Sequence, residues 1–438
     1  MEKLLEMAKK AADQAEIYSA ENISNVVSFQ DAKLYKIETN FLSGISLRII
    51  KDGRLGFAYT RNLIDRQEFL DNALHSLEGG VEAPYDLPDT KATKNLDTYD
   101  PKIKTTTSSE LIDEAQRICD TLKSKAKAEI RAVAFTEQDS LRILNSQGTD
   151  ISRQSSIAGT YGSTIFPGSG SGIDRQHQNK RLEKMPEALI TEIIELFGKG
   201  QKTIEPKGGR MKVLFMPDSM ITLLWRITSG LSGRSIYENI SPIAGKTGQK
   251  IFSQKLTITD DPLNDNYPLA RAFDDEGVAC NQLTLIDQGV LKSFYYDLKY
   301  AKKLEVPSTG HGYRSGPWGG DPVTTKPGPF PAHLFIKPGN AALAKLISMM
   351  DRGIIVEGAL GAHSGNIPNG DYSIGVGPGL YVENGQIVGQ IKDAMVTGNI
   401  YETLTNVVEL GDTLYPSFGG AWVPPLLCEG VSVTTKKQ

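Results

Sequence analysis

The alternation of apolar and polar positions changes character about half-way along the chain. In residues 3–13, leucines and alanines recur on one helical stripe, which predicts an N-terminal helix. Short apolar runs follow between residues 15 and 39, and they predict short strands. Asp52-Gly53 then lies between two β-rich runs, which is the strongest short-range signal of a hairpin. The chain therefore opens with a helix followed by antiparallel strands.

Three further helices are expected in the first half. Apolar residues at helical spacing predict one over residues 65–77 and a long one over 180–198. Thr107 and Glu110 have the spacing of a capping box, so another helix is expected to begin there. Strand pairs are expected between residues 129 and 166. This part of the chain is typical of an antiparallel sheet with flanking helices.

A polar segment at residues 199–210, which contains Pro206 and paired glycines, is the expected boundary. It divides the chain into an N-terminal α+β domain, residues 1–205, and a β-rich C-terminal domain, residues 206–438. The length of 438 residues fits two domains.

Glycine and proline are frequent in the second half, and strand-length runs alternate with turns. Helical patterns remain at residues 217–229 and 340–350. Asn384-Gly385 predicts a second tight hairpin. The expected fold class is therefore α+β, with a sandwich or barrel-like C-terminal domain of mostly antiparallel strands.

Composition narrows the function classes. Hydrophobic residues make up 39% of the chain and charged residues 23%, as in a globular protein with a large core. The formal net charge is -4 without a basic block, so direct nucleic-acid binding is not expected. Three widely spaced cysteines fit a reducing cytosol, and no apolar run is long enough for a membrane helix. We expect a cytoplasmic protein that is not bound to a membrane.

The most conspicuous candidate for chemistry is the glycine-rich stretch 358–380, which holds His363 next to Ser364. Neighbouring residues on an extended loop tend to point in opposite directions, so His363 is poorly placed as a base for Ser364. The alternative interpretation is a structural one: the stretch is a turn whose polar side chains form hydrogen bonds to backbone groups. No two of the five histidines are closer than 22 residues, which excludes a local helical zinc motif.

Two other segments carry polar candidates. The acidic cluster Asp274, Asp275 and Glu276 could bind a cation, although a solvated turn is the favoured interpretation. The glycine-rich segment around His311 contains Arg314 and Trp318, which could bind a peptide or an anionic group.

Long stretches in a fixed order resemble the TldD/PmbA family, also called the modulator of DNA gyrase family. The resemblance covers nearly the whole chain and includes 44–60, 249–262, 273–297 and 361–391. TldD-like members carry H-E-x-x-x-H on a helix and a cysteine in a later glycine-rich loop as zinc ligands. The matching helix here, 217–239, has no histidine, and the run 363–373, HSGNIPNGDYS, resembles the PmbA (TldE) branch.

The resemblance implies a subunit without zinc that works with a TldD-like metallopeptidase. No cofactor is expected in this chain, and zinc is expected in the partner. The implied assembly is a homodimer or heterodimer whose cavity admits unfolded or extended peptides, for proteolysis or peptide maturation. No catalytic residue is expected in this chain. The candidates for a peptide cleft or subunit interface are His363, Ser364, Gly365, Asn366, Asp371, His311, Arg314, Asp274, Asp275 and Glu276.

Two alternatives stay open. The chain could be a stand-alone hydrolase with an atypical site around His363 and His311. Metal ligation in this chain is then conceivable through His363, His311, Cys280 and Cys428. Alternatively, it could be a non-enzymatic regulatory protein linked to modulation of DNA gyrase.

Overall fold

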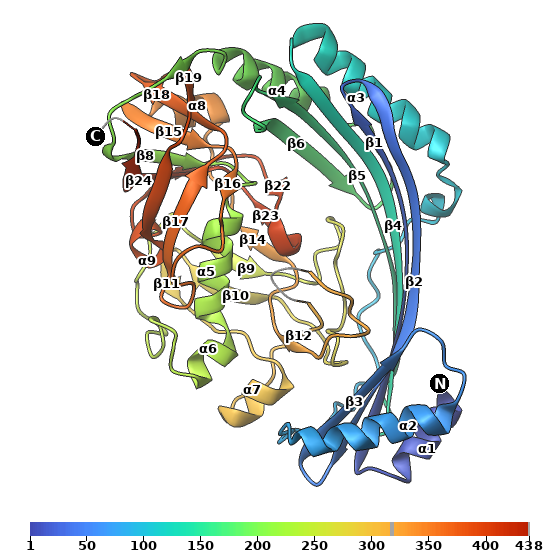
Figure 1. The fold of residues 1–438 in the computed structure, drawn as a ribbon. Helices are drawn as coiled ribbons and strands as arrows, with labels where there is room; N and C mark the ends of the chain where they lie inside the picture. Colours follow the sequence, from blue (N-terminus) through green and yellow to red (C-terminus); the bar gives the residue numbers. More distant parts are fainter. Residues whose placement is uncertain (316–318, 437–438) are drawn as a thin grey trace.

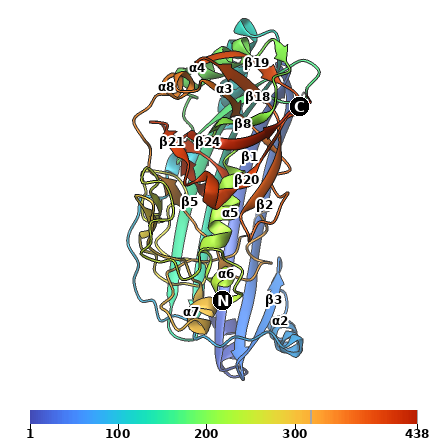
Figure 2. The ribbon, with the colours of Figure 1, turned by 90° about the vertical axis from the view of Figure 1, so that its left-hand side faces the viewer.

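The computed structural model describes residues 1–315 and 319–436, so Trp318 lies outside the described residues. Long N-terminal strands curve around the C-terminal half, with α3 on the outer face of the sheet (Figure 1). Figure 2 shows the narrower side, where the same strands run along the long axis of the molecule. The N-terminal half contains α1 (Glu2–Lys9), β1 (Gln14–Gln30), β2 (Lys33–Lys51), β3 (Arg54–Thr60), α2 (Arg66–His75), α3 (Ser108–Lys125), β4 (Glu129–Asn145), β5 (Asp150–Ile165), β6 (Gly172–Asn179) and α4 (Glu187–Lys199).

These six strands form one antiparallel sheet in the order β3-β2-β1-β4-β5-β6. Strands were expected between residues 15 and 39, but their expected length was wrong. The short segments are parts of two long strands, β1 and β2. The polar middle of β1 stays in register with β2 and β4 on both sides, so backbone pairing continues where the apolar pattern lapses. The Asp52-Gly53 hairpin is confirmed, with positive φ angles of 50° and 69°.

The helices of this half follow their local signals with one exception. Thr107 and Glu110 form the expected capping box at the start of α3. Asp65 caps α2 by accepting two backbone N–H groups. The helix expected from residue 180 is wrong at its start, because α4 begins only after Pro186, whose ring cannot occupy a helix interior.

The C-terminal half has two main sheets. Its elements up to α8 are β7 (Thr203–Ile204), β8 (Gly209–Phe215), α5 (Ile221–Leu231), α6 (Gly233–Tyr237), β9 (Ile258–Asp260), β10 (Leu283–Asp287), β11 (Val290–Leu291), α7 (Leu298–Lys303), β12 (Gly312–Tyr313), β13 (Gly328–Pro329), β14 (Leu334–Ile336) and α8 (Leu343–Ser348). The rest are β15 (Arg352–Val356), β16 (Ala359–Leu360), β17 (Asp371–Val376), β18 (Gly379–Glu383), β19 (Gln386–Ile391), β20 (Met395–Asn399), α9 (Ile400–Thr403), β21 (Val407–Leu410), β22 (Tyr415–Pro416), β23 (Trp422–Val423) and β24 (Leu426–Thr434).

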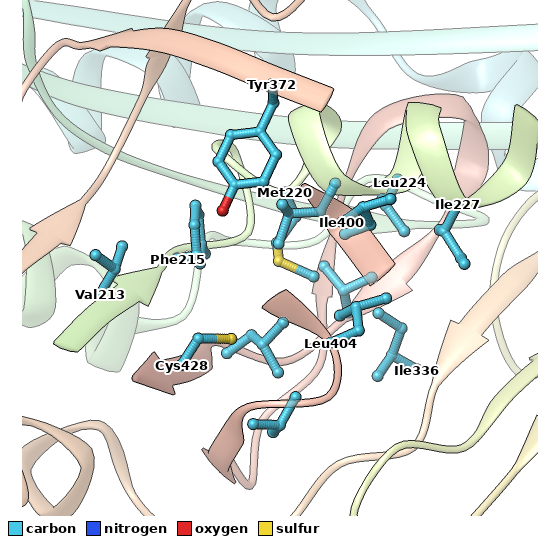
Figure 3. Packing of buried hydrophobic residues seen from close by; sticks show 14 of the residues in the cluster. Val213, Phe215, Met220, Leu224, Ile227, Ile336, Tyr372, Ile400, Leu404 and Cys428 are labelled. Atoms are coloured by element: carbon cyan, nitrogen blue, oxygen red, sulfur yellow. The ribbon is translucent and has the colours of Figure 1, made fainter. Parts of the chain in front are cut away.

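The larger sheet runs β16-β17-β20-β24-β8-β15-β18-β19-β7, and the smaller runs β11-β10-β9-β14-β23-β22. Side chains of both sheets and of α5 pack into one apolar cluster. In Figure 3 this cluster includes Phe215, Met220 and Ile336, which come from β8, the turn before α5, and β14. The α+β class is confirmed. The sheets remain open, and the described residues form no closed barrel.

A second apolar cluster joins the two halves. It combines α3 and α4 with Leu214 of β8, Leu380 of β18 and Leu427 of β24. The domain boundary expected at residues 205 and 206 stays a prediction. The strand just before it, β7, pairs with β19 of the larger sheet. The hairpin at Asn384-Gly385 is confirmed between β18 and β19. None of the described helices is long and apolar enough to cross a membrane.

Candidate functional site

The acidic turn at Asp274, Asp275 and Glu276 is buried, so the solvated turn expected from the sequence is wrong. The Asp274 carboxylate accepts backbone N–H groups from Glu276, Val278 and Gly312 at 2.8–3.0 Å. Burial, and then the charge of Glu276, raises the pKa of Asp274 well above its usual value. Asp274 therefore holds the turn closed and ties it to β12.

Glu276 belongs to a buried charge network that connects the two halves of the chain. Arg48 of β2 bonds Glu16 of β1 at 2.6 Å and Glu276 at 2.9 Å. Arg314 bonds the other oxygen of Glu16 at 3.1 Å and the Ser46 hydroxyl at 2.8 Å. The four charged side chains are at most 2 % exposed. Because Glu16 and Arg48 are register partners in the sheet, the strand pairing itself places these charges together.

His311 lies in the same buried region but outside that network. Its Nε2 is 3.1 Å from Asp260 Oδ2, and its Nδ1 is 2.8 Å from the Thr309 carbonyl oxygen. Burial is the largest single influence and would raise the pKa of Asp260. The hydrogen bond and charge of His311, together with the backbone N–H and charge of His333, outweigh burial and lower this pKa. The nearby Cys280 Sγ is 3.3 Å from the Tyr313 hydroxyl, and burial raises the pKa of this thiol to about 12. A neutral thiol of this kind is a poor nucleophile.

The glycine-rich loop is a separate site between β16 and β17. Its backbone is held by Arg226 of α5, which is fully buried. The guanidinium donates to the carbonyl oxygens of Ala362, Ser364 and Asp371 at 2.6–2.9 Å, and to Thr222 of its own helix at 2.8 Å. Burial lowers the pKa of Arg226 to about 10, so it remains a cation at neutral pH. A single side chain thus fixes both ends of the loop.

The remaining loop candidates face outward or brace the turn. His363, Gly365 and Asn366 are exposed, and Gly365 has the positive φ of 107° that favours glycine. The Asp371 carboxylate accepts side-chain amide bonds from Asn369 and Asn399, both at 2.8 Å, and these bonds lower its pKa. Asp371 is therefore already engaged in holding the turn.

The four conceivable metal ligands do not gather. Cys428 lies in the C-terminal core near Val213 and Phe215 (Figure 3), and burial raises its pKa. Cys280 and His311 contact Tyr313, while His363 is exposed on the loop. Within residues 1–315 and 319–436, no group of three or more His, Cys, Asp or Glu side chains is arranged to hold a metal.

Sequence reasoning missed two buried features. Arg226 stands alone on an apolar helix, and such an isolated cation is a signal that a buried partner exists. Asp174 of β6 lies beside Asp218, just before α5. Burial, and then the Asp218 charge, raises the pKa of Asp174 to about 7. Nothing in the local sequence around Asp174 indicates this.

Comparison with known proteins places the arrangement in a family. The profile of the PmbA/TldA metallopeptidase C-terminal domain matches residues 208–435, and that of PmbA/TldA metallopeptidase domain 1 matches residues 15–77. The chain belongs to the PmbA/TldD family. Both profiles cover parts of the sites described above: the buried network in β1 and β2, and the glycine-rich loop.

Relatives extend the similarity over almost the whole chain. An uncharacterised protein of Methanocaldococcus jannaschii is 25% identical over 94% of this chain and 95% of its own length. A protein of Methanothermobacter thermautotrophicus named metalloprotease is 25% identical over 91% and 88%. The crystal structure of TldE from Thermococcus kodakarensis superposes with a TM-score of 0.89 at 23% identity, covering 99% of both chains. This last likeness establishes the shared fold.

The residues between α5 and the loop do not fit the zinc site expected of a TldD-like PmbA/TldD member. Helix α5 carries no His, Cys, Asp or Glu side chain, and the guanidinium of its Arg226 already binds the loop carbonyl groups. A fixed positive charge at this position repels a divalent cation and leaves no thiolate or imidazole from the helix to bind it.

Proposed function

We propose that this chain is a metal-free, PmbA/TldE-like subunit of a peptidase whose zinc is held by a TldD-like partner. One observation carries the proposal: Arg226 binds the carbonyl groups of Ala362, Ser364 and Asp371 where TldD-like members are expected to hold zinc. Zinc lowers the pKa of bound water and polarises a peptide carbonyl, and in the proposed complex the TldD-like partner supplies both effects. The role of this chain is then to complete the substrate chamber and to hold the peptide.

The edge of β2 supports association with another chain. β3 pairs only with Ile45–Lys51 of β2, so the preceding part of the strand has β1 on one side and no described strand on the other. This edge carries exposed apolar side chains, Leu34, Tyr35, Ile37, Phe41 and Leu42. An unpaired, apolar edge of this length is a surface that another strand can extend.

The test is reconstitution with a TldD-like chain that carries H-E-x-x-x-H. An unfolded peptide is incubated with this chain alone, with the partner alone and with both, and cleavage is followed by mass spectrometry. We expect cleavage by the pair and none by this chain alone. Strong cleavage by the isolated chain would overturn the proposal and favour the stand-alone hydrolase.

A further inference from the structure

The first part of β2, residues 33–44, forms a free edge of the N-terminal sheet. β1 pairs with this segment on one side, and no described strand pairs with it on the other. The edge exposes large apolar side chains: Tyr35 is 70% exposed, Ile37 50% and Phe41 60%. Natural proteins usually protect such edges against pairing, so an apolar and unprotected edge indicates a binding surface.

The backbone groups that point outward from this edge can be assigned from a neighbouring hydrogen bond. Arg61, which follows β3, donates from Nη1 to the Ser43 carbonyl oxygen at 3.0 Å, so this carbonyl points away from β1. The outward direction recurs at every second residue of a strand, and the pairing with β1 has no register shift over residues 36–51. Three residues before Ser43 therefore direct their N–H and C=O groups to the free edge: Phe41, Thr39 and Ile37.

The open part of the edge is centred on Ile37. β2 begins at Lys33, and Arg61 occupies the carbonyl of Ser43 at the other end. Residues 33–41 thus remain open to a partner strand, and Ile37 is the middle residue of this segment. An antiparallel copy of the segment, placed with its own Ile37 opposite, pairs along the whole open length.

The charges on the edge are complementary to themselves in this register. Lys36 and Glu38 lie on either side of Ile37 and form an ion pair within β2. Placing the Ile37 residues of two copies opposite each other also puts Lys36 of each copy opposite Glu38 of the other. Opposite charges directly across a sheet are stabilising, so two further ion pairs support this arrangement.

Neighbouring registers are less favourable. Moving the symmetry axis by one residue places Glu38 opposite Glu38 of the second copy, and like charges in that position are destabilising. Moving the axis to Thr39 pairs Glu38 with Asn40 and loses both ion pairs. Pairing odd with even positions leaves the outward backbone groups without partners.

The exposed apolar side chains fit the same pairing. Ile37 is the register partner of Val27, and Leu34 is that of Phe29. Val27 and Phe29 are buried in the apolar cluster under α3, and directly opposite residues share a face, so Ile37 and Leu34 lie on the face that α3 covers. Phe41 follows Ile37 by four residues and lies on that face too. Pairing brings the two Ile37 side chains together at the rim of this cluster.

We propose that two copies of this chain associate by antiparallel pairing of their β2 edges, with Ile37 at the symmetry axis. The two six-stranded sheets then form one continuous sheet. A twofold interface uses the same patch on both copies and requires a patch that is complementary to itself. Lys36 and Glu38 meet this requirement, whereas an unrelated strand would not match them. The inference goes beyond the proposed function, because it does not depend on which subunit holds zinc.

The test is charge reversal at the two positions. Sedimentation velocity of the full chain gives the dissociation constant of the dimer for wild type, Lys36→Glu and Glu38→Lys. Each variant puts like charges opposite each other twice, so we expect dimerisation to weaken about tenfold or more. An equimolar mixture of the two variants has opposite charges at both contacts and should recover an affinity close to that of wild type.

Controls separate the interface from net charge and folding. Lys302→Glu makes the same change in net charge at an exposed lysine of α7 and should leave dimerisation unchanged. Thermal unfolding of each variant checks that the fold is intact. Hydrogen exchange of residues 33–44 should slow as the concentration of wild type rises, and this protection should be lost in Lys36→Glu.

Three results would overturn the inference: a wild-type chain that stays monomeric, a dimer that neither charge reversal weakens, or a mixture of the variants that dimerises no better than each alone. A monomer whose residues 33–44 become protected only with the TldD-like chain would assign the edge to that partner instead. Cleavage by the reconstituted pair tests the proposed function separately, so either idea can fail while the other stands.

Discussion

The buried charge network and the glycine-rich loop are the two regions that carry the polar candidates, and they are built in opposite ways. The network consists of four buried charged side chains, and each of them forms an ion pair with one of opposite charge: Glu16, Arg48, Arg314 and Glu276. In the loop, one buried cation, Arg226, binds only neutral carbonyl groups while the outer side chains face solvent. The network therefore stabilises the joint between the two halves, whereas the loop is a fixed backbone that presents exposed groups.

The largest effect is expected at the network. Glu16→Ala leaves the buried guanidiniums of Arg48 and Arg314 without their shared carboxylate. Removing one member of a buried ion network costs about 3–5 kcal/mol. Urea denaturation followed by circular dichroism measures the loss. Arg131→Ala, which breaks an exposed pair, should change stability by less than about 0.5 kcal/mol. Similar stability for both variants would show that the network is not a structural joint.

A smaller loss is expected at the loop. Arg226→Ala removes the donors that hold the loop carbonyl groups, and charged hydrogen bonds of this kind predict a loss of about 3 kcal/mol. Hydrogen exchange should rise at residues 361–371 and remain unchanged in the network. Arg226→Lys should protect the loop only partly, since an ammonium group cannot reproduce the fork. Unchanged hydrogen exchange at residues 361–371 in Arg226→Ala would contradict the role of Arg226 in holding the loop.

A pH dependence of stability is expected from Asp297, a buried residue whose carboxyl group is influenced by the charge of Glu276 in the network. Burial, and then the charge of Glu276, raises the pKa of Asp297 to about 7. A carboxyl group with a raised pKa stabilises the fold most when protonated, so its contribution falls as the pH rises towards 7. Asp297→Asn retains a side-chain oxygen that can accept the Tyr300 backbone N–H at the start of α7, but the amide cannot ionise. Between about pH 5 and pH 8, we expect the variant to lose roughly 2 kcal/mol less than wild type. Parallel denaturation profiles would refute this assignment.

The smallest effect is expected at the exposed end of the loop. His363→Ala should change the free energy of unfolding by less than about 0.5 kcal/mol, because the side chain is exposed. His311→Ala is the matched contrast, since it leaves the buried Asp260 without its imidazole partner and should cost about 2 kcal/mol. Equal losses at the two histidines would contradict the contrast between the buried His311 and the exposed His363.

Local signals allowed much of the fold to be predicted. The capping box at Thr107 and the hairpins at Asp52-Gly53 and Asn384-Gly385 were correct because each depends on a few adjacent residues. The start of α4 was wrong because Pro186 outweighed the apolar pattern before it.

The site depends on contacts that local patterns do not encode. Glu16 and Glu276 meet at Arg48 although they are far apart in sequence, so the acidic turn at 274–276 looked solvated. The loop around His363 was identified as a candidate, but the cation that holds it, Arg226, lies on a helix 136 residues before Ala362. Only the fold brings these groups together.

Zinc content is the most direct test of the central claim that Arg226 holds the loop where relatives are expected to hold metal. The untagged chain and a TldD-like partner are each equilibrated with zinc, dialysed against metal-free buffer and measured by elemental mass spectrometry. The account predicts that the partner retains stoichiometric zinc and this chain retains none. Stoichiometric zinc in this chain, lost in His363→Ala or His311→Ala, would contradict it.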